Sequence, residues 1–330
     1  MIRLTALGDV VLAEPVLRAL RRLRPNAPID FVTEAHYAAL ASRALPVDTV
    51  TAWDRRGEDA GFKGVERVKA RLPTGRYELI VDLQGKLRTR TLAHRLDAGR
   101  RLFLQKRSPL GAILSVFGHD PPQKQRHSTQ LYLDVLRPLG SLEGFDPRPR
   151  LGLPRTPHRG LRIGLAPGAS HATKEWPIDH FQALAQALTS ARPHAELSLL
   201  GGPSERAKLE VLRASTLTFA EGDSTTLDVL ALTERIAGLD LLISVDTGPA
   251  HLAAALGVPT VVIFGPTSPV RWGPLGEPHR AVSLSLDCAP CSNTGGARCP
   301  RPDRDLACLR SLSVERVLSE SLRALESVGR

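Results

Sequence analysis

Aromatic side chains make up only 4% of this chain of 330 residues. Stacking surfaces for single-stranded nucleic acid are therefore scarce, and no nucleic-acid recognition motif is present. No apolar run reaches the ~20 residues that a membrane-spanning helix needs. The first residues also lack the charged, apolar and small-residue order of a secretory signal. We therefore expect a cytoplasmic protein, in which the four cysteines do not form structural disulfides.

What is abundant is the composition of an ordinary globular enzyme. Hydrophobic residues account for 42% of the chain and charged residues for 24%, and its length suits two domains. Lys and Arg outnumber Asp and Glu by 44 to 34, so the formal net charge is +10. This excess is spread along the chain. It favours an anionic partner, which could be nucleic acid, a phosphorylated glycolipid or an anionic membrane surface.

Strand-like and helix-like segments alternate in both halves of the sequence. Ile2–Leu7 predicts a strand, Val10–Arg24 a helix and Ile29–Thr33 a second strand, which together make a β-α-β unit. The alternation resumes with Leu161–Ala166, after a proline-rich linker over 144–160. This pattern is typical of an α/β protein with two doubly wound parallel sheets. We divide the chain into domains 1–150 and 151–312, followed by a C-terminal helix within 313–330.

The stretch from 239 to 267 carries the strongest local signal. Leu239–Ser244 and Thr260–Phe264 read as buried strands, and Ala250–Leu256 reads as a short helix between them. Asp246-Thr247-Gly248 forms the polar turn that leads into this helix. A helix N-terminus offers free N–H groups and the positive end of a dipole, so this turn is a candidate phosphate site.

Each residue of that turn also has a simpler explanation. Asp246 or Thr247 could cap the helix, and His251 could be a packed core histidine. In the phosphate-site interpretation, the Thr247 hydroxyl adds a hydrogen bond and Gly248 lets the ligand approach the backbone. The turn alone does not decide between these alternatives.

Taken with its surroundings, the turn resembles a known family. Asp246-Thr247-Gly248-x-x-His251, followed by Gly265-Pro-Thr267, is similar to glycosyltransferase family 9, the ADP-heptose:lipopolysaccharide heptosyltransferases. Each matching motif is short, but their order and spacing cover nearly the whole chain. The other matches are Gly8-Asp9, Asp82-Leu-Gln84-Gly85, Pro167-Gly168-Ala-Ser170 and Lys174-x-Trp176-Pro177.

The resemblance implies a fold and a set of donor-binding residues. The fold is α/β with GT-B architecture, in which two doubly wound Rossmann-like domains face a central cleft. In that architecture the C-terminal helix within 313–330 often crosses back to the N-terminal, acceptor-binding domain. The residues implied to bind the nucleotide sugar are Ser170, Lys174, Glu205, Asp246, Thr247, Gly248 and His251.

Asp9 is implied as the catalytic base that takes the proton of the acceptor hydroxyl. The simpler explanation is that Asp9 caps the following helix. Gln84, Lys86 and Arg88 are implied to bind the acceptor. The segment after Asp9 lacks the histidine that many heptosyltransferases carry, so the sugar and the acceptor are not assigned.

Two further groups of residues allow more than one interpretation. The arginines downstream of Arg88 are either a solvated basic face or a patch for acceptor phosphates. Cys288-x-x-Cys291 with Cys299 and Cys308 could be a structural zinc site, although no second Cys-x-x-Cys follows, and free thiols are the default. The basic group comprises Arg88, Arg90, Arg95, Arg100, Arg101, Lys106 and Arg107.

The implied reaction is inverting transfer of a sugar, heptose from ADP-heptose or another nucleotide sugar, to a hydroxyl of a lipid-linked, anionic cell-surface glycan. No Asp-x-Asp stands at a predicted strand end, so no metal or other cofactor is expected. Contact with the inner membrane face would suit the net charge of +10. Two alternatives remain, a sugar-nucleotide epimerase of the same architecture and a basic nucleic-acid-binding protein. The oligomeric state is not indicated.

Overall fold

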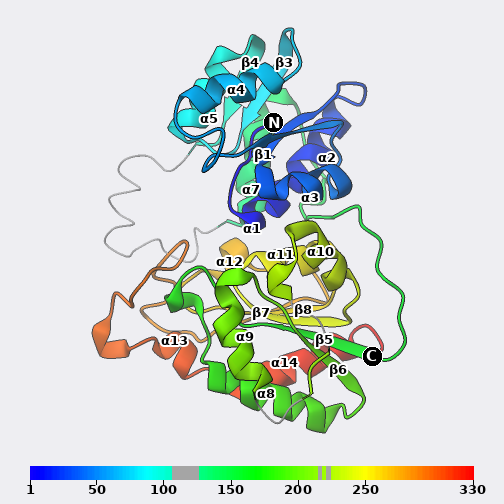
Figure 1. Ribbon diagram of the computed structural model, residues 1–330, viewed down its shortest axis with the longest axis vertical. Coiled ribbons are helices and arrows are strands. Elements are labelled where there is room, and N and C mark those ends of the chain that lie inside the picture. Colours follow the sequence, from blue (N-terminus) through cyan, green and yellow to red (C-terminus); the bar gives the residue numbers. More distant parts are fainter. Residues whose placement is uncertain (106–125, 215–217, 221–223) are drawn as a thin grey trace. The chain divides into compact units, whose positions relative to one another are not determined.

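The computed structural model describes residues 1–105, 126–214, 218–220 and 224–330 (Figure 1). Its contacts divide the chain into two compact units. Among the described residues, unit 1 contains 1–105 and 128–153, and unit 2 contains 126–127 and 154–330. The division between Leu153 and Pro154 falls within the proline-rich segment that the sequence analysis treated as a linker.

Unit 1 is built on parallel strands around the N-terminal segment. Strand β1 (Asp30–Glu34) pairs with β2 (Thr49–Trp53), and β3 (Tyr77–Asp82) pairs with β4 (Ala98–Phe103). Ile2 forms parallel bridges to both Val32 and Asp82, so the segment around Ile2 lies between β1 and β3. The α-helices of this unit are α1 (Leu7–Leu12), α2 (Glu14–Leu23), α3 (Ala38–Ala44), α4 (Lys63–Arg71), α5 (Leu87–Arg95) and α7 (Ser128–Leu133).

The start of the chain differs from the prediction in two ways. Strand-like pairing is confined to a bridge at Ile2, and the first helix already begins at Leu7. The single helix predicted over Val10–Arg24 is two helices, separated at Ala13. Pro15 explains the break, because proline has no N–H to donate to the preceding turn and its ring crowds that turn. The early start of α1 places Asp9 within a helix and not in a loop.

The core of unit 1 is formed by apolar side chains from its strands and its helices. Ile2 and Leu4 from the central segment pack with Trp53 of β2 and with Val65 and Val68 of α4. Trp53 and Val65 are fully buried. This packing fixes the central segment, and therefore fixes where Asp9 emerges from the sheet.

Unit 2 contains a five-stranded parallel sheet in the order β6-β5-β7-β8-β9. Strands β7 and β8 are buried along their whole length, as expected for a parallel sheet covered on both faces. The strands are β5 (Leu161–Ala166), β6 (Ala195–Leu199), β7 (Leu241–Val245), β8 (Thr260–Ile263) and β9 (Arg280–Val282). The α-helices are α8 (Ile178–Ala191), α9 (Arg206–Arg213), α10 (Val229–Ala237), α11 (Gly248–Ala255), α12 (Pro269–Trp272), α13 (Ala307–Arg310) and α14 (Val314–Glu326).

Helices cover both faces of this sheet (Figure 1). Alternate residues of β7 show the two faces: Leu241, Ile243 and Val245 join the core formed with α8, α9 and α14, while the intervening residues face the other side. On that other side Ala250 of α11 packs with Val262 of β8. The site of interest begins at α11.

The crossing of the C-terminal helix back to the first domain stays a prediction, and the main contacts of this helix lie within unit 2. Helix α14 lies against α8 and strands β7, β8 and β9, and residues 313–330 belong to unit 2. Its apolar stripe, which includes Val317, Ala324 and Leu325, is fully buried in the core of that unit. The chain end is held there as well, because Arg330 forms an ion pair with Asp240 at 3.2 Å.

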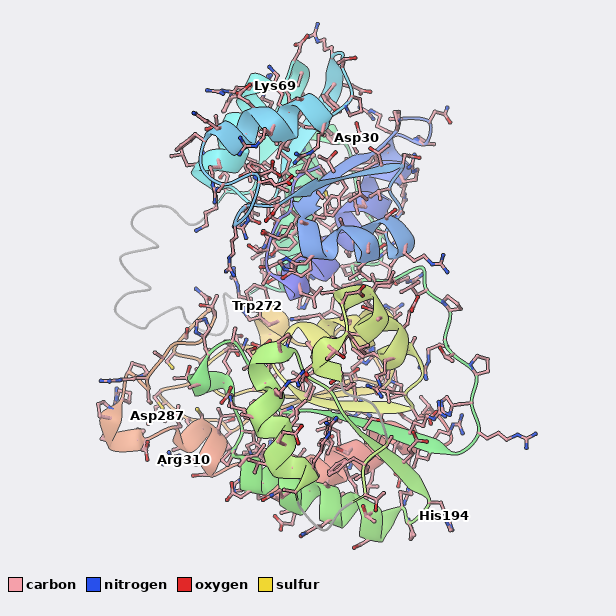
Figure 2. The ribbon with its side chains drawn as sticks, in the orientation of Figure 1. Asp30, Lys69, His194, Trp272, Asp287 and Arg310 are labelled. Atoms are coloured by element: carbon pink, nitrogen blue, oxygen red, sulfur yellow. The ribbon has the colours of Figure 1, made fainter. Side chains whose placement is uncertain are left out.

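Polar side chains such as Lys69, His194 and Arg310 project outward from the ribbon (Figure 2). Within the described part of the chain, no helix is both long enough and apolar enough to cross a membrane.

Candidate active site

Asp9 lies in the first turn of α1, just after the central segment of unit 1. Its Oδ2 is 2.7 Å from Nη2 of Arg3 and accepts a hydrogen bond from the Ala6 N–H at 3.1 Å. Its Oδ1 accepts a hydrogen bond of 2.6 Å from the hydroxyl of Tyr132. The Asp9 side chain is nevertheless 21% exposed. The carboxylate is therefore held in one orientation while part of it remains accessible.

Arg3 and Tyr132 form the supporting layer behind Asp9, and neither was predicted from the sequence. Arg3 is buried, donates through Nη1 to the carbonyl of Leu83, and lies 5.0 Å from the centre of the Tyr132 ring. A usable signal for Arg3 was present, since a charge between two buried apolar residues is unusual. Tyr132 had no local signal, because 123 positions separate it from Asp9.

In unit 2, four parallel strands end at the same edge of the sheet. Strand β6 lies on one side of β5 and β7 on the other, which makes a topological switch point at that edge, the usual ligand position in open α/β sheets. Lys174 follows β5, Glu205 follows β6, Asp246 follows β7 and Thr267 follows β8. The predicted donor-binding residues are thus carried by loops that follow the ends of neighbouring strands.

Asp246 is the centre of a buried polar group at this edge. Lys174 Nζ is 2.9 Å from Asp246 Oδ2, and the Thr267 hydroxyl donates to the same oxygen at 2.7 Å. The other oxygen, Oδ1, is 3.9 Å from His251 Nε2. The Lys174 and Asp246 side chains are only 11% and 6% exposed. The structure therefore brings together three predicted residues and adds Thr267.

The N-terminus of α11 offers backbone donors. Thr247 stands at the N-cap, but its side chain makes no capping bond to the helix. Its hydroxyl lies 3.3 Å from both the Val245 carbonyl and the Ser244 hydroxyl. Pro249 has no N–H, and the N–H groups of Gly248 and Ala250 fall in the first turn, where an α-helix supplies no partner. Such a helix end favours an anion.

A comparison with known proteins assigns the family. Residues 65–297, more than half of the chain, match the model of glycosyltransferase family 9 (heptosyltransferase). The chain belongs to glycosyltransferase family 9. Lipopolysaccharide heptosyltransferase 1 of Pseudomonas aeruginosa is 27% identical over 307 residues, which cover 88% of this chain and 85% of that protein.

Solved structures support the same fold for this family 9 chain. A family 9 glycosyl transferase from Veillonella parvula matches 99% of this chain and 96% of its own, with a TM-score of 0.81 at 20% identity. An E. coli heptosyltransferase solved with ADP matches 97% of this chain and 98% of its own, with a TM-score of 0.71 at 20% identity. The prediction of an α/β fold with GT-B architecture is confirmed.

Glu205 stabilises the loop after β6 in this family 9 unit. It accepts hydrogen bonds from the Gly202 N–H at 2.6 Å and from the Ser204 hydroxyl at 2.7 Å. It also packs against the loop after β5, since a Cβ on Gly168 would lie 2.0 Å from Glu205 Cγ. Ser170 is exposed in that same loop. Glu205 thus lies beside the loop after β5, and its hydrogen bonds are to groups of its own loop after β6.

The motif at the end of β3 organises the backbone of the family 9 chain. Asp82 Oδ1 accepts from the N–H groups of Gln84 and Gly85 at 2.8 and 2.9 Å. Gln84 Oε1 accepts from the N–H groups of Leu4 and Thr5 at 3.1 and 3.2 Å, and its side chain is buried. These contacts tie the β3 loop to the segment before Asp9. The geometry therefore favours a structural role for Gln84 over direct acceptor contact.

Lys86 and Arg88 differ from the other basic residues of this region. Lys86 is exposed and Arg88 is half-buried, and neither side chain forms an ion pair with another described residue. Arg101 instead donates to the carbonyls of Ala93, Leu96 and Ala98, and Arg100 donates to that of Pro138. Arg95 pairs with Glu66. The predicted basic patch is therefore partly structural, while Lys106 and Arg107 lie outside the described residues.

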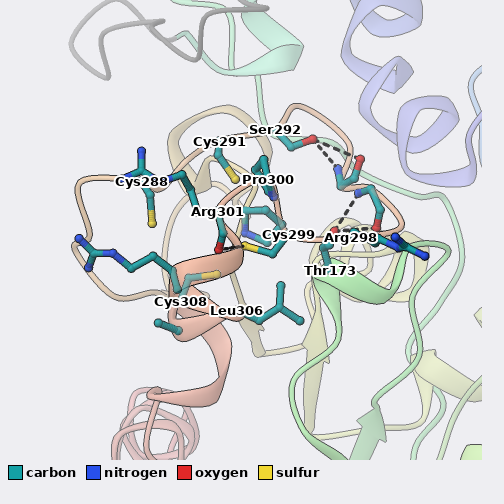
Figure 3. A pocket seen from close by; sticks show the side chains of 15 residues that line it. Thr173, Cys288, Cys291, Ser292, Arg298, Cys299, Pro300, Arg301, Leu306 and Cys308 are labelled. Carbon is teal, nitrogen blue, oxygen red and sulfur yellow. Dashed lines mark hydrogen bonds between the residues drawn. The ribbon is translucent and has the colours of Figure 1, made fainter.

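The four cysteines are free and gather around one cavity of about 220 Å³ (Figure 3). Burial raises the pKa of Cys308 to about 11 and also raises the pKa of Cys291. Cys299 Sγ donates to the Arg301 carbonyl at 3.3 Å. Across the described chain, no three His, Cys, Asp or Glu side chains are grouped so as to hold a metal ion. The zinc interpretation of the cysteines is therefore not supported.

His127 precedes α7 and is buried. Its Nε2 donates to the Gly273 carbonyl at 2.9 Å. Burial lowers the pKa of His127 to about 4, against the Gly273 bond that raises it and with smaller lowering effects of His251 and Arg271. The imidazole is therefore neutral near pH 7 and serves to anchor the chain within unit 2.

Proposed function

We propose that this family 9 protein is an inverting glycosyltransferase that moves heptose from ADP-heptose to a hydroxyl of a lipopolysaccharide core. The observation that carries the donor part is the meeting of Lys174, Asp246 and Thr267 at the strand edge in unit 2 that also carries the N-terminus of α11. Cationic and N–H donors in a mostly buried site suit a diphosphate.

The departing nucleoside diphosphate gains negative charge as the bond between the sugar and the diphosphate breaks. Lys174 and the N–H groups of Gly248 and Ala250 are the groups we assign to that charge. Thr247 and His251 line the same helix end, and Glu205 is assigned to the nucleotide ribose, whose paired hydroxyls a carboxylate can accept. These donors supply the charge stabilisation, so the proposal requires no divalent metal ion.

Asp9 is the proposed base for the acceptor hydroxyl. As the new bond between oxygen and the sugar forms, the hydroxyl proton passes to the accessible part of the Asp9 carboxylate. The pair of electrons released from the sugar–phosphate bond stays with the diphosphate. Tyr132 and Arg3 keep Asp9 oriented. One displacement on the sugar carbon inverts its configuration.

The acceptor is proposed to be an anionic, lipid-linked glycan presented at the inner membrane face. The charge excess of +10 is one supporting feature, and the other is that neither Lys86 nor Arg88 forms an ion pair with a described residue. Arg88 can hold phosphate oxygens in pairs, whereas Lys86 acts as a point charge. The lipopolysaccharide heptosyltransferase from Pseudomonas aeruginosa gives the acceptor class its precedent.

The test is a transfer assay with purified protein, ADP-heptose and a lipopolysaccharide core that lacks heptose, in the presence of a metal chelator. We expect release of ADP and addition of one heptose mass to the acceptor. Binding of ADP, UDP and GDP is measured in parallel by calorimetry, and ADP should bind preferentially. Turnover of the donor without acceptor would point to the epimerase alternative, and preference for another nucleotide would replace the heptose donor.

A further inference from the structure

The loop that carries the cysteines touches the proposed phosphate-binding lysine. Gly295 has a φ of +89°, and a Cβ at this position would lie 2.8 Å from both Cγ and Cδ of Lys174. It would also lie 3.0 Å from Cβ of His171. The backbone of Gly295 therefore lies directly against the aliphatic stem of Lys174. Only glycine satisfies both the φ angle and the close contact.

Thr173, the neighbour of Lys174, binds the same loop through its side chain. The Thr173 hydroxyl donates to the Gly296 carbonyl at 2.9 Å and accepts from the Gly296 N–H at 2.8 Å. The Thr173 N–H also donates to the Gly296 carbonyl, at 3.3 Å. Thr173 is buried, and Figure 3 shows these bonds at the rim of the cavity. The turn that carries Lys174 is thus attached to the loop directly beside the lysine stem.

The other end of the loop is attached to the partner of the lysine. The Pro266 carbonyl accepts from the N–H groups of both Cys291 and Ser292, each at 2.9 Å. Ser292 Oγ in turn accepts from the Gly295 N–H at 2.9 Å. Pro266 directly precedes Thr267, whose hydroxyl donates to the Asp246 oxygen that also pairs with Lys174. The contacts therefore form a closed ring from Lys174 through the loop to Asp246 and back.

We propose that residues 291–296, the 291–296 loop, position Lys174 for the diphosphate, with Thr173 and Gly295 as the positioning residues. A lysine side chain has a flexible four-carbon stem, so ordering it costs conformational entropy when an anion binds. A stem already confined by Gly295 has lost that freedom beforehand, and binding becomes tighter. The inference rests on the proposed function in one respect, the assignment of Lys174 to the diphosphate.

The chain offers a matched pair of glycines for the test. Gly295→Ala introduces a methyl group against the Lys174 stem. Gly296→Ala is the control, since the nearest atom to a Cβ there is the Arg298 carbonyl oxygen at 3.8 Å. A second pair of variants, at Thr173, keeps the proposal testable if Gly295→Ala does not fold. Thr173→Val removes the hydroxyl bonds to Gly296 and Thr173→Ser keeps them. Thermal unfolding shows whether each variant folds.

The first measurement is calorimetric ADP binding in a double-mutant cycle with Lys174→Ala. We expect Gly295→Ala and Thr173→Val to weaken ADP binding by about fivefold to tenfold, approaching the effect of Lys174→Ala, because a charge-assisted contact is worth at least a factor of ten. In the Lys174→Ala background neither change should weaken binding further. Gly296→Ala and Thr173→Ser should bind ADP like the wild type. Equal weakening in both backgrounds would show a general structural effect and overturn the proposal.

The second measurement separates this inference from the proposed function. In ADP-free protein, acetylation of Lys174 by an amine-reactive reagent is followed by mass spectrometry. Labelling should be faster in Gly295→Ala and Thr173→Val than in the wild type and in both controls, because the stem is released. Unchanged labelling would overturn the positioning role, whatever ADP does. If labelling changes but Lys174→Ala binds ADP normally, the confinement stands, and the donor role of Lys174 fails together with the claim that the loop serves it.

Discussion

Asp9 in unit 1 and Asp246 in unit 2 have similar partners but different exposure. Each aspartate follows a parallel segment, pairs with one cation and accepts a hydrogen bond from one hydroxyl: Arg3 and Tyr132 at Asp9, Lys174 and Thr267 at Asp246. The Asp9 side chain is 21% exposed, however, and that of Asp246 only 6%.

The difference separates a group that can react from a group that positions its neighbour. Asp246 receives both Lys174 and Thr267 on a single oxygen and is nearly enclosed, so it is suited to holding the lysine. Asp9 has its partners divided between its two oxygens and keeps access to solvent, so it can still accept a proton. The cations differ as well. Arg3 is buried and also donates to the Leu83 carbonyl, whereas Lys174 ends at the strand edge that carries the proposed donor site.

The largest expected effect tests the reactive side of this comparison. Asp9→Asn keeps the shape of the side chain but removes the base. We expect transfer to fall at least about 10³-fold, since a positioned general base contributes factors of this order. ADP affinity measured by calorimetry should be unchanged, because Asp9 and the donor residues belong to different units. Transfer at the wild-type rate would remove Asp9 from the mechanism.

The next effect tests the positioning side. Lys174→Ala should weaken ADP binding by about tenfold to a hundredfold, through loss of a charge-assisted contact to the diphosphate. Asp246→Asn should weaken it less, because the lysine keeps its charge and loses only its anchor. Calorimetry on both variants ranks them. The reverse order would show that Asp246 itself contacts the ligand.

Acid should act on unit 2 through His127. Its pKa is lowered from 6.5 to about 4 in the folded protein, so the unfolded chain binds the proton more readily between these values. The stability that neutral His127 contributes to the folded protein is therefore fully present above pH 6.5 and is lost as the pH falls towards 4. At about pH 5 the loss should be about 2 kcal/mol relative to neutral pH.

Urea unfolding at about pH 7 and about pH 5 measures this loss, which scales with the pKa difference. The variant His127→Asn has no imidazole to protonate. Its stability should change less between the two pH values, although its stability at neutral pH falls with the bond to Gly273. An equal pH dependence in both proteins would assign the acid sensitivity to other groups.

The smallest effects come from removing one hydroxyl partner on each side. Tyr132→Phe should lower kcat by about threefold to tenfold and leave ADP affinity intact, since one hydrogen bond is worth about 1 kcal/mol. Thr267→Val should weaken ADP binding by a similar factor. Steady-state kinetics and calorimetry on both variants show whether each change affects kcat or ADP affinity. If both changes act on the same parameter, the two aspartates do not have separate roles.

The sequence predicts the parts of the fold that depend on local patterns. Strand β5 has the bounds expected from its buried apolar run. The prediction failed where local signals conflict. The Gly-Asp turn signal hid the start of α1 at Leu7, and the helix was extended through Pro15 although proline disfavours it. Strand β9 was missed, since three residues carry too little pattern.

The candidate site likewise has parts that local motifs predict and parts that they do not. Lys174 and Asp246 could be named from short motifs because loops after neighbouring parallel strands end at one edge. The ion pair between these two residues could not be predicted, nor could the contact of Gly295 with the Lys174 stem. Such contacts depend on how distant segments pack. Gln84 shows the opposite error. Its motif was visible, but the side chain is engaged with the backbone of Leu4 and Thr5.

The pairing of Lys174 with Asp246 has a consequence for ligand selectivity. Without a ligand, the charge of Lys174 is balanced by the Asp246 carboxylate, so we expect small anions to gain little from this lysine. A ligand gains from this lysine only if it competes with Asp246 at close range. Free phosphate or chloride cannot also occupy the N-terminus of α11 and a ribose site, whereas a nucleoside diphosphate can. In the proposed donor site, the ion pair would thus favour a nucleoside diphosphate over small anions.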